Sequence, residues 1–157
     1  MRELSTAQME DVLIRNGVGV LGLVQDGQPY TIPMSFGYDG DEMTFPMQWG
    51  TGYDGRKEQC VESNTSASFT VYEQDPDKPQ LWRSIVMTGT LYEIEEEKKE
   101  RAFASLAANA EFASDLGVWG IPFDQVELRL FGLSIDECTG REFSPRHQRE
   151  DRSPNSR

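Results

Sequence analysis

Alternation of apolar and polar residues recurs along much of the chain and predicts short β-strands joined by tight turns. The predicted strands cover residues 18–24, 30–38, 42–47, 66–72, 81–94 and 126–135. The dipeptides Asp26-Gly27 and Asp39-Gly40 separate neighbouring strands and are typical of hairpin turns. Gly89 is expected to kink the longest strand, and Gly140 is expected to form a turn where residues 136–142 close the last one.

Helical periodicity appears in two longer segments, residues 5–16 and 95–108. Ser5 and Gln8 fit a capping box at the start of the first. In the second, Phe103 and Leu106 are expected on the buried face, opposite Glu and Lys side chains that can pair along the helix. A shorter helix is expected to run from Asp54, as N-cap, to residue 63. Strands with helices at their ends predict a mainly β fold, a small β-barrel with α additions.

One domain is expected over residues 1–143, since no repeat and no earlier boundary is visible in the sequence. Residues 144–157 contain almost no apolar residue and are expected to form a disordered tail.

Residues 27–57 carry the strongest chemical signal. Arg56 and Lys57 fall in the first turn of the short helix, where the helix macrodipole favours anions over cations. A bound phosphate would explain this placement, because helix N–H groups and two cationic side chains meet there. The alternative is that both are solvated and pair with Asp54 or Glu58. Pro33 and Pro46 cannot donate to a sheet ladder, so the two strands before this helix are expected to leave backbone free at an edge.

Charge excludes several classes of partner. The chain of 157 residues has 15 basic and 27 acidic residues, with a net charge of −12. Such a surface repels nucleic acid and anionic membranes. No apolar run is long enough to cross a membrane, so a cytoplasmic location is expected. The acidity suits a salt-rich cytoplasm, as in a halophilic archaeon, although an ordinary acidic cytosolic protein is the alternative.

Metal chemistry is not expected. Cys60 and Cys138 lie far apart, and the single histidine, His147, lies in the polar tail. This arrangement lacks the ligand spacing of a zinc site. Cys60 is expected to pack in the core, with approach to a ligand as the alternative.

Four segments together resemble one family: Pro29–Gly40, Phe45, Gly55–Lys57 and Trp82–Val86 with Gly89. In order and spacing they are similar to the pyridoxamine 5'-phosphate oxidase-like FMN-binding proteins over residues 5–142, closest to the branch with nitroimidazole-resistance proteins. The resemblance implies an FMN-binding split β-barrel. It also implies a homodimer with an FMN at the subunit interface, because family members build each flavin site from both chains.

The resemblance assigns roles by position. Arg56 and Lys57 would hold the FMN phosphate, assisted by Arg83 and Ser84 at the phosphate or the ribityl chain, unless Arg83 is simply exposed at a strand end. The segment that would run beside the isoalloxazine ring is Pro33, Met34, Ser35 and Phe36. The loop position that would approach the ring and the ribityl chain is occupied by Pro46, Met47 and Gln48. No catalytic residue is assigned, because hydride chemistry belongs to the flavin.

Two departures limit the resemblance. Many relatives carry a histidine directly after the phenylalanine of the second strand, and Pro46 stands there in this chain. True pyridoxamine-phosphate oxidases carry substrate-phosphate residues in their C-terminal part, and residues 130–142 show no counterpart. The expected function is therefore an FMN-dependent oxidoreductase acting on an unidentified small molecule, with NAD(P)H or a similar donor. The alternatives are a reductase of the same fold using the deazaflavin F420, against which the acidic composition argues mildly, and a flavin-binding or storage module without turnover.

Overall fold

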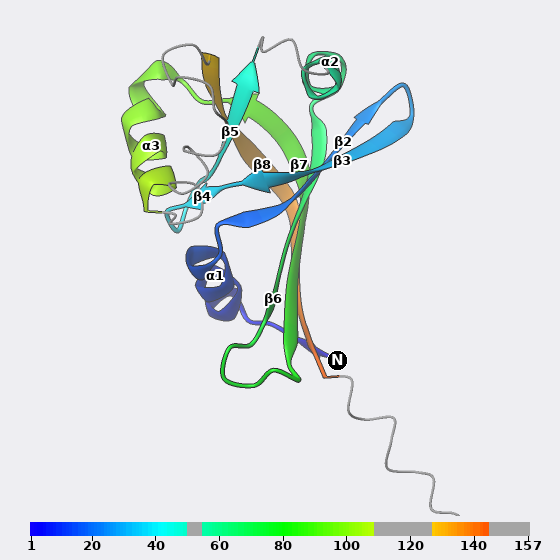
Figure 1. The fold of residues 1–157 in the computed structure, drawn as a ribbon, viewed down its shortest axis with the longest axis vertical. Coiled ribbons are helices and arrows are strands. Elements are labelled where there is room, and N and C mark those ends of the chain that lie inside the picture. Colours follow the sequence, from blue (N-terminus) through cyan, green and yellow to red (C-terminus); the bar gives the residue numbers. More distant parts are fainter. Residues whose placement is uncertain (50–54, 109–126, 145–157) are drawn as a thin grey trace, which may run out of the picture.

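The computed structural model describes residues 1–49, 55–108 and 127–144 and shows a mainly β fold (Figure 1). Its strands are β1 Arg2–Glu3, β2 Val18–Gln25, β3 Gln28–Ser35, β4 Gly37–Tyr38, β5 Met43–Trp49, β6 Ser66–Gln74, β7 Trp82–Glu93 and β8 Glu127–Phe143. Its helices are α1 Thr6–Arg15, α2 Arg56–Ser63, the 3-10 turn η1 Glu96–Lys98 and α3 Lys99–Ala107.

All the strands of the described residues belong to one antiparallel sheet of eight strands. The order is β3-β2-β6-β7-β8-β5-β4, and β1 pairs with the end of β8. The sheet curls until β3, its first strand, packs against β5 without pairing with it. The predicted β-barrel with α additions is confirmed, and the barrel has an open seam between β3 and β5.

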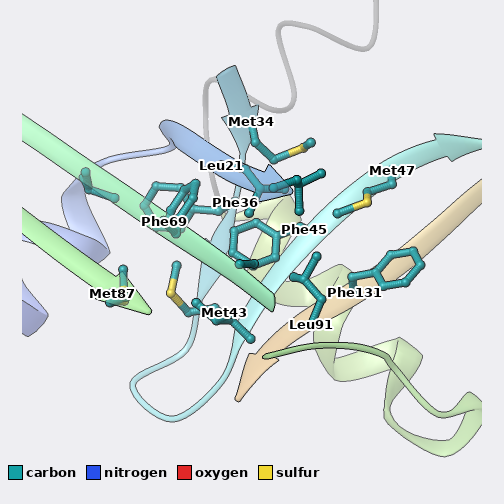
Figure 2. Packing of buried hydrophobic residues seen from close by; sticks show 14 of the residues in the cluster. Leu21, Met34, Phe36, Met43, Phe45, Met47, Phe69, Met87, Leu91 and Phe131 are labelled. Carbon is teal, nitrogen blue, oxygen red and sulfur yellow. The ribbon is translucent and has the colours of Figure 1, made fainter. Parts of the chain in front are cut away.

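Three phenylalanines hold the strands beside this seam (Figure 2). Phe36 and Phe45 both pack edge-on against Phe69, with ring centroids 5.2 and 4.8 Å away. None of the three is more than 1% exposed. Burial of each ring stabilises the fold by about 2–3 kcal/mol, so the backbone on either side of the seam is firmly placed.

Helix α1 begins as the sequence predicts. The Ser5 side chain accepts from the Gln8 N–H and the Gln8 side chain accepts from the Ser5 N–H, which completes the capping box. Val12 and Leu13 are buried in the core, and the helix lies across the end of the barrel opposite α2 (Figure 1).

The last strand corrects the predicted turn at Gly140. β8 continues through this residue to Phe143. A Cβ atom at Gly140 would lie 2.7 Å from the Met9 sulfur and 3.0 Å from the Leu4 Cβ. The glycine therefore allows α1 and the N-terminal segment to approach the strand. β7 runs as one strand through Gly89, and the β7–β8 register shifts there because β8 carries one extra residue, Asp136; the predicted kink of β7 itself stays a prediction.

Helix α3 corrects a second prediction. Phe103 is 41% exposed, whereas Ala102 and Leu106 are buried. The first turn of the predicted helix is the 3-10 turn η1. The ion pair between Lys99 and Glu96, 2.7 Å long, confirms the predicted pairing along the exposed side.

Some predictions lie outside the described residues, among them the tail, of which residues 145–157 are not described. Within the described ranges, no helix is both long and apolar enough to cross a membrane. The same ranges contain no group of side chains arranged to hold a metal ion.

Candidate functional site

The start of α2 is the first component of the site. The helix begins at Arg56 with Gly55 as N-cap, one residue later than the predicted N-cap Asp54, which lies outside the described residues. The first helical hydrogen bond runs from the Gln59 N–H to the Gly55 carbonyl, 2.8 Å. Because glycine has no side chain, the N-cap supplies no side-chain acceptor to the N–H groups of the first turn.

Arg56 differs from the other arginines of the described chain. Each of the others forms an ion pair with a carboxylate: Arg2, Arg15, Arg83, Arg101, Arg129 and Arg141. Within the same residues Arg56 has no such pair, and its guanidinium carbon instead lies 4.9 Å from the centre of the Tyr30 ring. The side chain is exposed, and no carboxylate of the described residues neutralises its charge.

Lys57 is half-buried beside it. Burial lowers the pKa of its amine below the ordinary value, and the neighbouring charge of Glu58 offsets only part of that effect. No ion pair to Lys57 occurs among the described residues. A partly dehydrated ammonium is costly unless an anion approaches it. Two cations and a helix start thus form a donor set that fits a phosphate.

The free edge of β3 is the second component. The Phe36 N–H bonds to the Gly17 carbonyl, so alternate residues of β3 point their backbone groups toward β2. The residues between them are Pro29, Thr31, Pro33 and Ser35, whose backbone groups point away from β2. Proline has no N–H, so only Thr31 and Ser35 present donors at this edge. The predicted edge position of Pro33 is confirmed.

The strand that faces β3 across the seam, β5, also has an unpaired edge among the described residues. Pro46 pairs with Leu130 of β8 on one side, whereas β4 on the other side pairs only with Met43 and Thr44. In the described chain Pro46 therefore also lies at an edge, as predicted.

Burial divides the predicted ring-side residues into two groups. Met34, Phe36 and Met47 are core residues, between 0 and 7% exposed, and can reach a ligand only through their backbone. Side chains reach the surface at Pro33, Ser35, Pro46 and Gln48.

Arg83 and Ser84 lie elsewhere in the chain. Arg83 pairs with Glu73 across the β6–β7 ladder, seven residues along β6 from Ser66, which is roughly 23 Å of extended strand. Figure 1 shows α2 at the other end of β6. Within one chain the structure therefore does not bring Arg83 and Ser84 to Lys57.

The guanidinium of Arg83 is surrounded by carboxylates. Its nitrogens lie 3.3 Å from Glu73, 2.7 Å from Asp75 and 2.9 Å from Glu142. Burial opposes its charge, but hydrogen bonds to Glu142 and Glu73 outweigh burial and raise its pKa. The strand-end alternative, an exposed arginine, does not describe this side chain, which is 19% exposed.

Ser84 lies on one face of strands β2, β3, β6 and β7 whose described members carry no charge; on β8 the same face continues with Arg141 beside Ser84 and Glu137 beside Thr88. We call the part on the first four strands the uncharged face; its members are Val18, Val20, Gly22, Val24, Pro29, Thr31, Pro33, Ser35, Ser66, Ser68, Thr70, Tyr72, Ser84, Val86, Thr88 and Thr90. The alternate residues of the same strands point into the core. Charged residues make up 27% of the chain, so their absence from this face of the four strands is unusual. Three large hydrophobic members of the face are exposed: Val18, Tyr72 and Val86.

Tyr30 has no predicted role in the sequence, but in the structure its ring lies under the Arg56 guanidinium. The two residues are far apart in sequence, and only the packing of α2 against the β2–β3 hairpin brings them together. The alternation of β3, which turns Tyr30 toward the barrel interior, was the available signal.

A curled antiparallel sheet with an open seam is the architecture of the split β-barrel class. The family model described as pyridoxamine 5'-phosphate oxidase matches residues 5–142, and the chain belongs to this family. No curated protein matches the sequence.

Solved structures share the fold. An FAD-binding protein from Mesorhizobium loti is 24% identical, with a TM-score of 0.72, over 91% of this chain and 98% of that one. A proposed 5-nitroimidazole antibiotic resistance protein from Bacteroides thetaiotaomicron is 18% identical, with a TM-score of 0.65, over 90% and 87%. An FAD-binding protein from Mycobacterium smegmatis is 17% identical, with a TM-score of 0.61, over 92% and 99%.

Proposed function

We propose that this protein binds FMN with the phosphate at the start of α2 and acts as a flavin-dependent oxidoreductase on a small molecule. The observation that carries the proposal is the pair Arg56 and Lys57, which have no carboxylate at ion-pair distance among the described residues. Membership of the family supports it, as do the FAD-binding proteins among the structural relatives.

The residues fit the group. Arg56 would offer planar N–H donors, Lys57 a point charge and α2 its first N–H groups to a phosphate. At the seam, the backbone from Pro33 to Phe36 would run beside the flavin ring, with donors at the β3 edge. The loop position at Pro46, Met47 and Gln48 would face the ring from β5.

When bound, the flavin supplies the electron and hydride transfer. The protein's residues would bind the phosphate, orient the ring and exclude water from one side of it. The only histidine is His147, in the tail. Many relatives carry a histidine at the position that Pro46 occupies in this chain. No imidazole is therefore assigned a proton-transfer role at the ring.

We further propose that two copies pair through the uncharged face. At a net charge of −12 per chain, two copies repel each other unless the contact surface is free of acidic groups. The members of this face on β2, β3, β6 and β7 meet that condition, Glu137 and Arg141 of β8 border them, and Pro33 and Ser35 connect the face to the β3 edge of the seam. A second copy on this face would therefore lie next to the flavin, and Ser84 would serve the site of the partner rather than its own.

The phosphate site is tested by the double variant Arg56→Ala, Lys57→Ala in FMN titrations. We expect a loss of at least about 100-fold in affinity, since each charge-assisted hydrogen bond contributes about 1.5–3 kcal/mol. The matched control is Lys98→Ala, Lys99→Ala, which removes the same charge from an exposed helix start. A folded double variant that keeps full FMN affinity contradicts the site.

The cofactor itself is identified by the mass of the molecule released from the purified protein. Release of FMN would support the proposal. Release of FAD or F420 would mean that this molecule, and not FMN, is the cofactor. Slow or absent reoxidation after chemical reduction of the bound flavin would favour storage over turnover.

A further inference from the structure

We infer that Tyr30 is a positioning residue for the cofactor phosphate and that it acts through Arg56. The inference rests on the proposed function and deepens it, because it concerns how the phosphate-binding arginine is held before the ligand arrives.

The geometry is that of a cation over an aromatic ring. The Arg56 guanidinium carbon lies 4.9 Å from the centre of the Tyr30 ring, inside the roughly 6 Å range of a cation–π contact. Tyr30 itself is half-buried in β3 and packs against the main hydrophobic core. The ring is therefore a fixed support, and the exposed guanidinium is the movable group.

A second contact fixes the position of α2 on the β2–β3 hairpin, which also carries Tyr30. The Gln25 side-chain amide donates to the Gln59 side-chain oxygen, 3.3 Å. Gln59 lies three residues after Arg56, on the same side of the helix. Asp26 and Gly27 both have positive φ, 50° and 73°, as a tight hairpin turn requires. The turn fixes the register of β2 with β3, so Gln25 and Tyr30 are presented to α2 together.

A ring suits this task better than a carboxylate. In the described chain the other arginines are paired with carboxylates, which would compete with a phosphate for the same N–H donors. A ring attracts the cation through its face and leaves the N–H groups at the guanidinium edge available. Arginine also has one of the largest side-chain entropies, so an arginine already held in place loses less freedom when the phosphate binds.

The test compares FMN with riboflavin, which has the same ring but no phosphate. Tyr30→Leu should weaken FMN binding about two- to fivefold, the range of an exposed cation–π contact, and should leave riboflavin affinity unchanged. Tyr30→Phe keeps the ring and should keep the ratio of FMN to riboflavin affinity. If Tyr30→Leu does not fold, Tyr30→Ile, which suits a strand, takes its place.

Coupling to Arg56 is tested in the Arg56→Ala background, where Tyr30→Leu should have no further effect on FMN affinity. Equal losses for FMN and riboflavin would indicate a purely structural role and overturn the inference, as would unchanged FMN affinity in Tyr30→Leu. If the unchanged protein bound neither FMN nor riboflavin, the proposed function would fail and this inference with it. Normal binding that depends on Arg56 but not on Tyr30 would overturn the inference alone.

Discussion

Arg83 shows how a residue's surroundings decide its role. The sequence places it in a segment that resembles a flavin-binding family, and the resemblance suggests a phosphate ligand. In the structure its charge is already balanced by Glu73 and Asp75 from one side and Glu142 from the other. These partners lie 10, 8 and 59 residues away, so no local pattern could reveal them. Arg56 and Lys57, by contrast, were predicted correctly at the helix start because a helix start is a local feature.

Replacement of Arg83 tests this role. Arg83→Met should lower the free energy of unfolding by about 2–4 kcal/mol at pH 7, because it leaves partly buried carboxylates facing one another. Urea unfolding measures the loss. The control is Arg101→Met, whose ion pairs are on an exposed side chain, and which should cost about 1 kcal/mol or less.

The effect should depend on pH. At Glu73, burial favours the neutral form, but hydrogen bonds from Arg15 and Asn16 outweigh it and lower the pKa. At Glu142, hydrogen bonds from Arg2 and Arg83 lower the pKa. A carboxyl group with a lowered pKa stabilises the fold above its ordinary pKa, and that stabilisation is lost as the pH falls. The difference between Arg83→Met and the parent should therefore shrink below about pH 4.5, the ordinary value for glutamate. A difference that stays constant from pH 7 to pH 4 would contradict the role of these carboxylates.

At the scale of the element, strands were predicted better than their ends. Alternation identified β2, β3, β5, β6 and β7, because each buries one face. It missed the second half of β8, where exposed residues follow one another from Ser134 to Thr139 and only Gly140 is buried. Helix α3 was predicted at the right place but with Phe103 on the wrong side, since size suggested burial while the helix turns the smaller Ala102 inward.

Gly89 gives an element-scale prediction. A Cβ atom at this position would overlap the Ser134 carbonyl oxygen of the adjacent strand. Gly89→Ala should therefore destabilise the protein by about 1–3 kcal/mol, as overpacking of a core does. The control is Thr88→Ala at the exposed neighbouring position. Chemical unfolding of both compares them, and equal stability of the two variants would show that the strands move apart at no cost.

At the scale of the whole molecule, a strongly acidic chain carries, among the described residues, an uncharged face on four neighbouring strands, which Glu137 and Arg141 of β8 border. This distribution could not be predicted from the sequence alone, because the face is assembled from alternate residues of four strands whose order in the sheet differs from their order in the chain. Once the order is known, the absence of charge is plain from the sequence.

A charge placed on this face should separate the proposed pair of chains. Val86→Asp introduces a carboxylate at its centre, where burial of an unpaired charge costs several kcal/mol, so the dimer should dissociate at least about 100-fold more readily. Sedimentation of parent and variant at high salt, where chain–chain repulsion is screened, measures this. Phe103→Asp is the matched control, because both side chains are 41% exposed and Phe103 lies on α3. A parent that sediments as a monomer and still holds flavin tightly would contradict the proposed interface.

Pro29 and Pro33 of β3 also affect the tendency of the protein to aggregate. A free sheet edge is a template on which another chain can add a strand, and such addition leads to aggregation. Of the four residues whose backbone groups face outward on β3, two cannot donate a hydrogen bond, so a continuous ladder cannot form there. The β3 edge can thus remain unpaired without serving as a template for another strand, which lowers the risk of fibril growth at the seam where we propose that the flavin binds.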